Sequence, residues 1–255
     1  MARNWNREEE ILAFVLYCKV PFGKIHAQNP QIIRLAQLMD RTPASVSMKM
    51  ANFGRFDPAL QKRGIKGLSN GSKLDEQVWN EFHQDWEGLI EEYQKIMDQN
   101  QRGSLIAPEK DLAQTFPEGY CTLSETKQRV NQDFFREAVM ISYGGKCCIT
   151  GMNIPVLLIA SHIKPWSVSD PKTERVSPSN GLLLNAFHDR AFDKGLITID
   201  TKHAIRISSK IREYEPKEIC EKWLLSYEGK TIRLPEKFFP ERRFIEYHND
   251  EVFVE

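Results

Sequence analysis

The chain has 255 residues, of which 41% are hydrophobic and 27% charged, a composition that indicates a soluble globular protein and excludes a disordered one. The formal net charge at pH 7 is zero, which alone argues weakly against a nucleic-acid partner. No apolar run approaches the roughly 20 residues that span a bilayer, and the N-terminus lacks the apolar segment of a secretory signal. Five cysteines without C-x-x-C spacing favour reduced thiols and a cytoplasmic location.

Charge is unevenly distributed along the chain. Residues 1–70 contain 11 Lys/Arg and 5 Asp/Glu, a net charge of +6, whereas residues 71–120 contain 4 and 11, a net charge of −7. A basic N-terminal segment suggests that any phosphate contact begins there. Charge asymmetry of this size also arises by chance in small domains. A phosphate-binding role and a chance distribution are therefore equally open interpretations.

The N-terminal segment has the pattern of a compact helical unit. Helices are predicted over 8–20, over 29–40 with Asn29 as cap, and over 41–53 with Thr42 as cap. The last two resemble a helix-turn-helix, in which Lys49 and Asn52 would face solvent and contact nucleic acid. Three-helix units serve protein contacts just as often, so both uses stay open.

The middle of the chain separates this unit from a second one. Residues 75–99 predict one amphipathic helix with an acidic, solvated face. Residues 100–120, with prolines and scattered polar residues, predict a linker, and residues 127–144 predict a further helix. The predicted domains are therefore 1–99 and 121–255.

The second unit contains a strand, a long polar loop, a strand and a short helix, with its core over 155–199. The first strand, PVLLIASHI at 155–163, ends at His162 and is followed by the loop 164–179. Asn180 and Gly181 lead into the apolar strand LLL, and NAFHDRAFDKG forms a helix that Gly195 ends. This order predicts a ββα unit.

The ββα unit carries the residues that indicate chemistry. Asp189 and Asp193 are four residues apart, so they project from one face of the helix, where a hard cation such as Mg²⁺ or Mn²⁺ would relieve their repulsion. His162 could reach the same place and deprotonate a water, while Asn180 bonds backbone across the loop or orients the imidazole. Such a set suits metal-assisted hydrolysis of a phosphodiester. Lys164 and Arg190 flank it and are candidates for phosphate contact.

Three segments of this unit resemble the HNH, or ββα-metal, nuclease motif: SHIKPW, SNGLLL and HDRAFDKGLITI. The resemblance is closest to the version found in bacterial restriction endonucleases with an N-terminal helical region. It implies that His162 is the general base, that Asn180 holds the loop, and that Asp189 and Asp193 bind one divalent ion. His188 is a candidate for the same metal set, either as a ligand or as a residue that supports the ligands. Relatives often have an aspartate before the base, where this chain has Ser161. Many also bind structural zinc through two C-x-x-C pairs, but the adjacent Cys147 and Cys148 predict no four-cysteine zinc site.

The sequence thus predicts an α+β protein in which a helical, helix-turn-helix-like domain precedes an HNH nuclease domain. The expected function is metal-dependent cleavage of DNA, and the resemblance implies products with a 5′-phosphate and a 3′-hydroxyl and a setting in restriction or defence against foreign DNA. A homodimer is an open expectation, since one HNH site cuts one strand at a time. Two alternatives remain: a non-catalytic DNA-binding regulator that uses the N-terminal helices, and a nuclease subunit of a larger defence complex.

Overall fold

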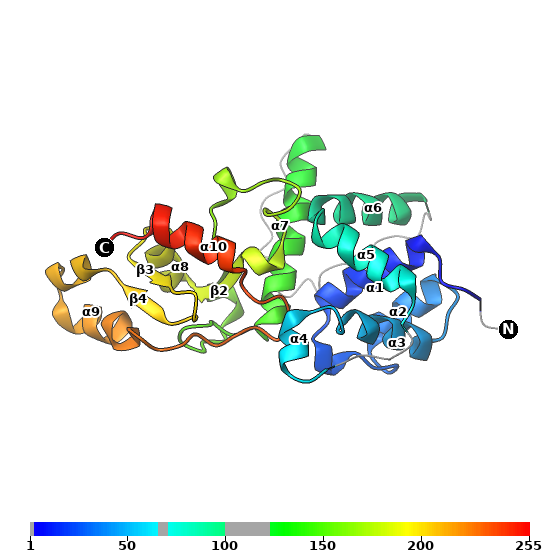
Figure 1. Ribbon diagram of the computed structural model, residues 1–255, viewed down its shortest axis with the longest axis horizontal. Coiled ribbons are helices and arrows are strands. Elements are labelled where there is room, and N and C mark those ends of the chain that lie inside the picture. The colour runs from blue at the N-terminus through cyan, green and yellow to red at the C-terminus, as the bar shows by residue number, and fades with distance from the viewer. Residues whose placement is uncertain (1–2, 66–70, 100–122) are drawn as a thin grey trace.

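The computed structural model describes residues 3–65, 71–99 and 123–255 (Figure 1). The N-terminal part is helical and comprises α1 (Arg7–Lys19), α2 (Pro30–Leu38), α3 (Pro43–Phe53), α4 (Pro58–Lys62), α5 (Lys73–His83) and α6 (Trp86–Gln99). The C-terminal part comprises α7 (Leu123–Ser142), β1 (Leu158–His162), β2 (Gly181–Asn185), α8 (Ala186–Asp193), β3 (Ile197–Ile199), β4 (Ile205–Ile207), α9 (Lys217–Trp223) and α10 (Arg242–Tyr247). The predicted α+β class is confirmed. None of the helices in these ranges is long and apolar enough to cross a membrane.

α2 and α3 begin at the capping residues that the sequence predicts. Asn29 Oδ1 accepts a hydrogen bond from Gln31 N at 2.9 Å, and Thr42 Oγ1 accepts one from Ser45 N at 3.2 Å. A proline occupies the first turn of each helix, where its missing N–H costs nothing. α1, α2 and α3 pack against one another around a shared apolar core.

Lys49 and Asn52 of α3 point into the protein, so the expectation that they face solvent is wrong. Lys49 Nζ lies 2.6 Å from both Glu10 Oε1 of α1 and Asp75 Oδ1 of α5. Asn52 Nδ2 donates to Asp75 Oδ2 at 3.4 Å, and all four residues are buried. The two buried carboxylates need a positively charged partner, which Lys49 supplies. Both carboxylates belong to helices that are far from α3 in the sequence.

The helix predicted over 75–99 is interrupted, and two helices take its place. α5 ends at His83, and Asp85 then begins α6 because its Oδ1 accepts a hydrogen bond from Gly88 N at 2.9 Å. The break turns Trp86 inward, where it is fully buried. The predicted linker, residues 100–120, lies outside the described residues.

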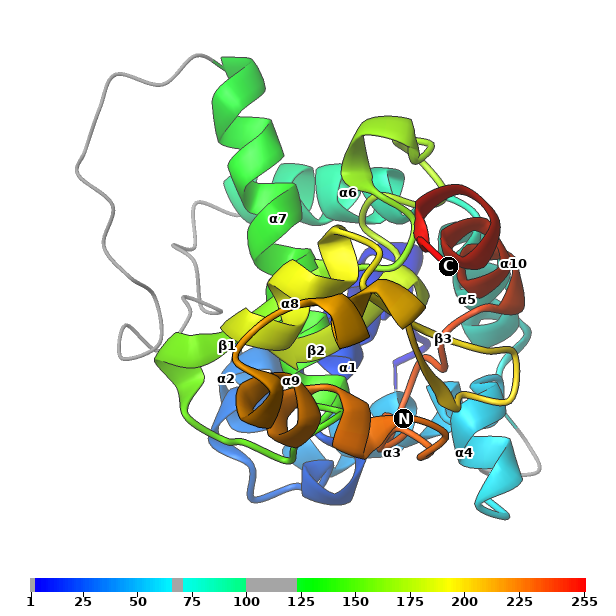
Figure 2. The same ribbon diagram turned by 90° about the vertical axis from the view of Figure 1, so that its left-hand side faces the viewer.

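The C-terminal part is built around the antiparallel hairpin of β1 and β2, which lies between α7 and α8 (Figures 1 and 2). The pairing sets Ser161 opposite Leu182 and His162 opposite Gly181. The predicted strand starts later than expected, because residues 155–157 form a 3₁₀ turn. Gly195, with φ of +66°, follows the end of α8 as predicted.

The segment around Lys237 and Phe238 returns to the N-terminal part and joins it to the C-terminal part. Lys237 is fully buried, and its Nζ donates hydrogen bonds to the carbonyl oxygens of Tyr17 and Val20 at the end of α1. Phe238 N donates to Asp57 Oδ2 at 3.1 Å, and the Phe238 ring stacks on Trp79. One continuous apolar core therefore runs through both parts.

Candidate active site

His162 ends β1 with its ring packed against α7. The imidazole stacks on Phe135 with ring centroids 3.9 Å apart, and the Trp166 ring stands nearly perpendicular to it with centroids 5.5 Å apart. His162 Nε2 lies 2.8 Å from the carbonyl oxygen of Arg175 in the following loop. A carbonyl only accepts, so Nε2 carries the proton and Nδ1 of the neutral ring keeps its lone pair. Burial lowers the pKa of His162, which favours this neutral form at pH 7.

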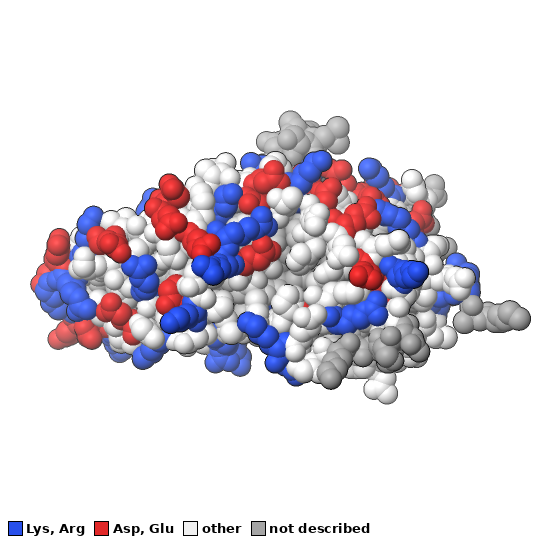
Figure 3. Space-filling model, viewed as in Figure 1, with Lys and Arg blue, Asp and Glu red and all other residues white. Residues whose placement is uncertain are grey.

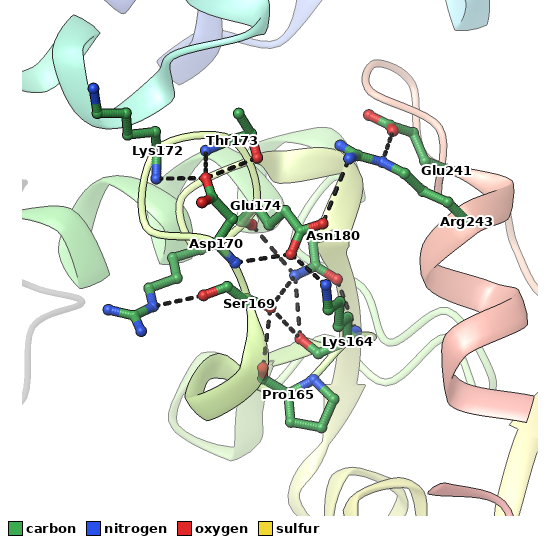
Figure 4. A network of polar contacts seen from close by, with 11 residues as sticks. Lys164, Pro165, Ser169, Asp170, Lys172, Thr173, Glu174, Asn180, Glu241 and Arg243 are labelled. Carbon is green, nitrogen blue, oxygen red and sulfur yellow. Dashed lines mark hydrogen bonds and ion pairs between the residues drawn. The ribbon is translucent and has the colours of Figure 1, made fainter. Parts of the chain in front are cut away.

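Asn180 is fully buried and fastens the loop that follows β1 (Figure 4). Its Oδ1 accepts from Lys164 N at 2.8 Å, and its Nδ2 donates to the carbonyl oxygens of Lys164 at 3.2 Å and Glu174 at 3.3 Å. Glu174 directly precedes Arg175, whose carbonyl holds His162. Asn180 therefore orients the imidazole indirectly, through the backbone at 174–175, and makes no hydrogen bond to the ring itself.

Glu174 is a residue of this site that sequence reasoning missed. Its buried carboxylate accepts from Lys164 Nζ at 2.6 Å and from Asp170 N at 2.8 Å, and Arg243 of α10 lies 3.5 Å away (Figure 4). These contacts lower its pKa despite partial burial. The predicted phosphate contact Lys164 is thus engaged in an ion pair within the loop. No spacing signal marks Glu174, because its partners come together only in the fold.

The two aspartates of α8 lie on the opposite side of the hairpin from α7. Burial, helped by the charge of Asp193, raises the pKa of Asp189, and the nearby Ser161 hydroxyl opposes this rise. Burial also raises the pKa of Asp193, which is more exposed. Ser161 Oγ is itself buried and reaches no hydrogen bond of normal geometry. A carboxylate beside an unsatisfied buried hydroxyl is the feature that a small cation would complete.

The imidazole of His162 and the carboxylates of α8 lie on opposite faces of β1. Successive side chains of a strand point to opposite faces, so His162 meets α7 while Ser161 meets Asp189 of α8. Both positions lie at the C-terminal end of β1, where the strand stops. A phosphodiester could therefore contact both only by crossing this end of the hairpin.

His188, one residue before Asp189, is buried and fully engaged. Its Nδ1 lies 2.9 Å from Asn185 Nδ2, and its Nε2 lies 2.8 Å from the carbonyl oxygen of Trp223 in α9. Burial lowers the pKa of His188. With Nε2 donating and Nδ1 accepting, no lone pair of the ring remains for a metal, and the ring instead anchors α9.

The other predicted contacts are separated from the site or lie at its rim. Arg190 is exposed on α8. Lys49 and Asn52 are buried in the N-terminal part. Among the residues that the structure describes, no three His, Cys, Asp or Glu side chains gather closely enough to hold a metal ion. A metal here would therefore take much of its coordination from water and substrate.

The adjacent cysteines support the helix of the site. Cys147 and Cys148 are buried, and Cys147 Sγ accepts a hydrogen bond from Asn185 N at 3.3 Å. Asn185 Oδ1 in turn caps α8 by accepting from Phe187 N and His188 N. Cys147 thus positions the start of the helix that carries Asp189.

Comparison with known proteins agrees with this geometry. Residues 147–200 match the family model described as HNH endonuclease, a range that contains both strands of the hairpin, the loop and α8. No curated protein matches the chain. HNH nucleases generally use a divalent metal, and the paired aspartates beside Ser161 are consistent with that requirement. The segment from Cys147 to Asp200 is therefore an HNH endonuclease domain.

Proposed function

We propose that this protein is a divalent-metal-dependent endonuclease that hydrolyses DNA, with His162 as general base and Asn180 as the residue that positions it. The observation that carries the proposal is the tie between His162 Nε2 and the Arg175 carbonyl, which leaves Nδ1 as the basic atom of a neutral ring. Among the described residues, no hydrogen bond to Nδ1 competes with a water molecule.

The hydrolytic step follows from this tautomer. As a water oxygen attacks the phosphorus, its proton passes to Nδ1 of His162, and the bond from phosphorus to the 3′-oxygen breaks. The leaving oxygen takes a proton from solvent, so the products carry a 5′-phosphate and a 3′-hydroxyl. The imidazolium donates from Nε2 to the same Arg175 carbonyl. This hydrogen bond strengthens on protonation, because a charged donor binds an acceptor more strongly than a neutral donor does.

Asp189 and Asp193, together with the Ser161 hydroxyl, fit a single Mg²⁺ or Mn²⁺. Asp189 is half-buried beside Asp193, and Ser161 Oγ is a buried oxygen next to the Asp189 carboxylate that makes no hydrogen bond of normal geometry. Oxygen ligands are those that these hard cations prefer. When bound, the ion would stabilise negative charge on the phosphate and on the leaving oxygen. We leave His188 out of this ligand set because both of its ring nitrogens are engaged.

The biological setting that we propose is restriction, or defence against foreign DNA, in the cytoplasm. Arg190, exposed on α8, is the better candidate for phosphate contact than Lys164, whose ammonium is paired with Glu174. The face of the molecule in Figure 3 carries interspersed basic and acidic side chains. Docking of DNA on this face would thus depend on local contacts. A homodimer would supply a second active site for the second DNA strand.

Plasmid cleavage with and without Mg²⁺ or Mn²⁺ tests this function. Wild type, His162→Ala, Asp189→Asn and the control His26→Ala, an exposed histidine of the N-terminal part, would be compared on modified and unmodified plasmid. We expect metal-dependent nicking or linearisation that the first two variants abolish and the control retains. Protein that shifts DNA in a gel but cleaves no plasmid with either metal would instead support the DNA-binding regulator.

A further inference from the structure

A cavity of about 230 Å³ is lined by Trp166 and Arg175, two residues that contact His162. It opens where α6, α7 and the loop after β1 meet, and Glu87, Asn131 and Trp166 contribute to its wall. The loop rests on α6 through a long backbone contact from Glu87 N to the carbonyl oxygen of Lys172 at 3.4 Å. The cavity is smaller than the pockets that hold drug-sized ligands, so its occupant has about the size of one planar ring system.

The part of the cavity wall next to His162 offers an aromatic face and a positive charge. The Arg175 guanidinium lies 5.3 Å from the centre of the Trp166 ring, and the Trp166 ring packs nearly perpendicular to His162. Arg175 Nε donates to the carbonyl oxygen of Ser169, and the neighbouring carboxylate of Glu174 pairs instead with Lys164 and Arg243. Aromatic and guanidinium planes of this kind are the surfaces on which unstacked nucleobases lie.

The opposite wall offers hydrogen-bond acceptors. Asn131 is buried, and its Oδ1 has no hydrogen-bond partner. Its Nδ2 is directed to Glu87 Oε1 at 3.4 Å, and the same carboxylate pairs with Lys127 Nζ at 3.0 Å. Lys127 also pairs with Glu91, so its charge is compensated twice. A ligand that donates hydrogen bonds would bind the Glu87 carboxylate at the cavity wall, and a small rotation of the Asn131 side chain would bring its buried, unpaired amide oxygen to the same ligand.

We propose that this cavity binds one unstacked nucleobase that carries an exocyclic amino group, next to the phosphodiester presented to His162. The nucleobase stacks on Trp166 and donates from its amino group to Asn131 Oδ1 and the Glu87 carboxylate. Thymine offers a carbonyl oxygen at the corresponding place and is disfavoured. The inference rests on the proposed function for its substrate class, and it assigns a base preference to a nuclease loop that otherwise serves to hold the imidazole.

The test measures binding without cleavage. Fluorescence anisotropy of labelled ten-nucleotide single strands, oligo(dC) and oligo(dT), would be recorded with the full-length protein in EDTA. Cytosine and thymine are similar in size and differ in the amino group, so their affinity ratio reports the acceptors. We expect wild type to bind oligo(dC) about tenfold more tightly, the effect of one satisfied buried acceptor. Asn131→Leu should bring the ratio close to one, and Trp166→Leu should weaken both strands about tenfold.

Two further variants make the outcome decisive. Glu87→Gln, which replaces an acceptor with a donor on α6, should also lower the ratio and serves if Asn131→Leu fails to fold. The control Asn153→Leu, at an exposed position away from the cavity, should keep the wild-type ratio. His162→Ala should lose plasmid cleavage and keep the ratio, which separates the cavity from the chemistry. A wild-type ratio of one, or a ratio unchanged in both Asn131→Leu and Glu87→Gln, overturns the inference even if the protein cleaves DNA.

Discussion

The loop that holds the proposed base depends on one buried amide, and Asn180→Asp tests this dependence with almost no change in shape. The wild-type Nδ2 group points at the carbonyl oxygens of Lys164 and Glu174. An ionised carboxyl at this position would replace a donor with an acceptor and would face both carbonyl oxygens in a fully buried place. Oδ1 would keep its hydrogen bond from Lys164 N, so the loss is confined to the donor side.

The expected cost follows from these contacts. Two lost hydrogen bonds at about 1 kcal/mol each give a loss of roughly 2 kcal/mol, and an ionised carboxyl that faces both carbonyl oxygens in a buried place adds to it. Each carbonyl keeps one other donor, since Ser169 Oγ donates to Lys164 O and Ser177 N donates to Glu174 O. A buried carboxyl can instead take up a proton, which restores one donor. The destabilisation should therefore be larger at pH 8 than at pH 5.

Equilibrium urea unfolding followed by circular dichroism would measure this cost at both pH values. Asn153→Asp, which makes the same change at an exposed position, is the matched control and should stay within about 0.5 kcal/mol of wild type. A loss below about 1 kcal/mol for Asn180→Asp at pH 8 would refute the reasoning, because the donor contacts would then contribute little.

Three other perturbations have defined outcomes. The cleavage rate should rise with pH through a pKa below 6.5 and then level off, because burial lowers the pKa of His162 and the base must be neutral; a pH–rate profile checks this. Burial raises the pKa of Glu10 to about 7, so the folded state holds a proton that the unfolded chain releases above pH 4.5, and this group's contribution to stability falls as pH rises toward 7. Glu10→Gln should therefore flatten the decline in unfolding free energy between pH 5 and pH 8, whereas an unchanged slope would contradict the assignment. Gly195→Ala should destabilise by more than Gly229→Ala in thermal unfolding, by roughly 2 kcal/mol, because both have positive φ but only the first would place a Cβ 2.0 Å from the carbonyl oxygen of Val252.

Local signals in the sequence predicted the elements better than they predicted exposure. The caps Asn29 and Thr42, and Gly195 after α8, each act within one helical turn, so their effect can be read from neighbouring residues. The aspartates of α8 follow equally from helical spacing. The burial of Lys49 does not, because it depends on Glu10 and Asp75, which reach α3 only through tertiary packing.

The parts of the site that the sequence did not predict are also long-range. Glu174 becomes the centre of the loop through Lys164 and Arg243, which lie 10 and 69 residues away. The side chain of His162 meets α7 because the hairpin is covered on both faces, and strand alternation alone could not say which helix covers which face. The roles proposed for His162, Asn180 and Asp189 remain predictions until cleavage is measured.

The burial of Lys237 has a consequence for the order in which the chain can assemble. The last carbonyl groups of a helix lack partners within it, and those at the end of α1 receive theirs from a residue 217 to 220 positions later. Since synthesis proceeds from the N-terminus, α1 emerges long before the ammonium group that caps it. The N-terminal helices thus complete their core only after the HNH domain has been synthesised, and a fragment ending before Lys237 would contain every one of those helices yet leave α1 uncapped.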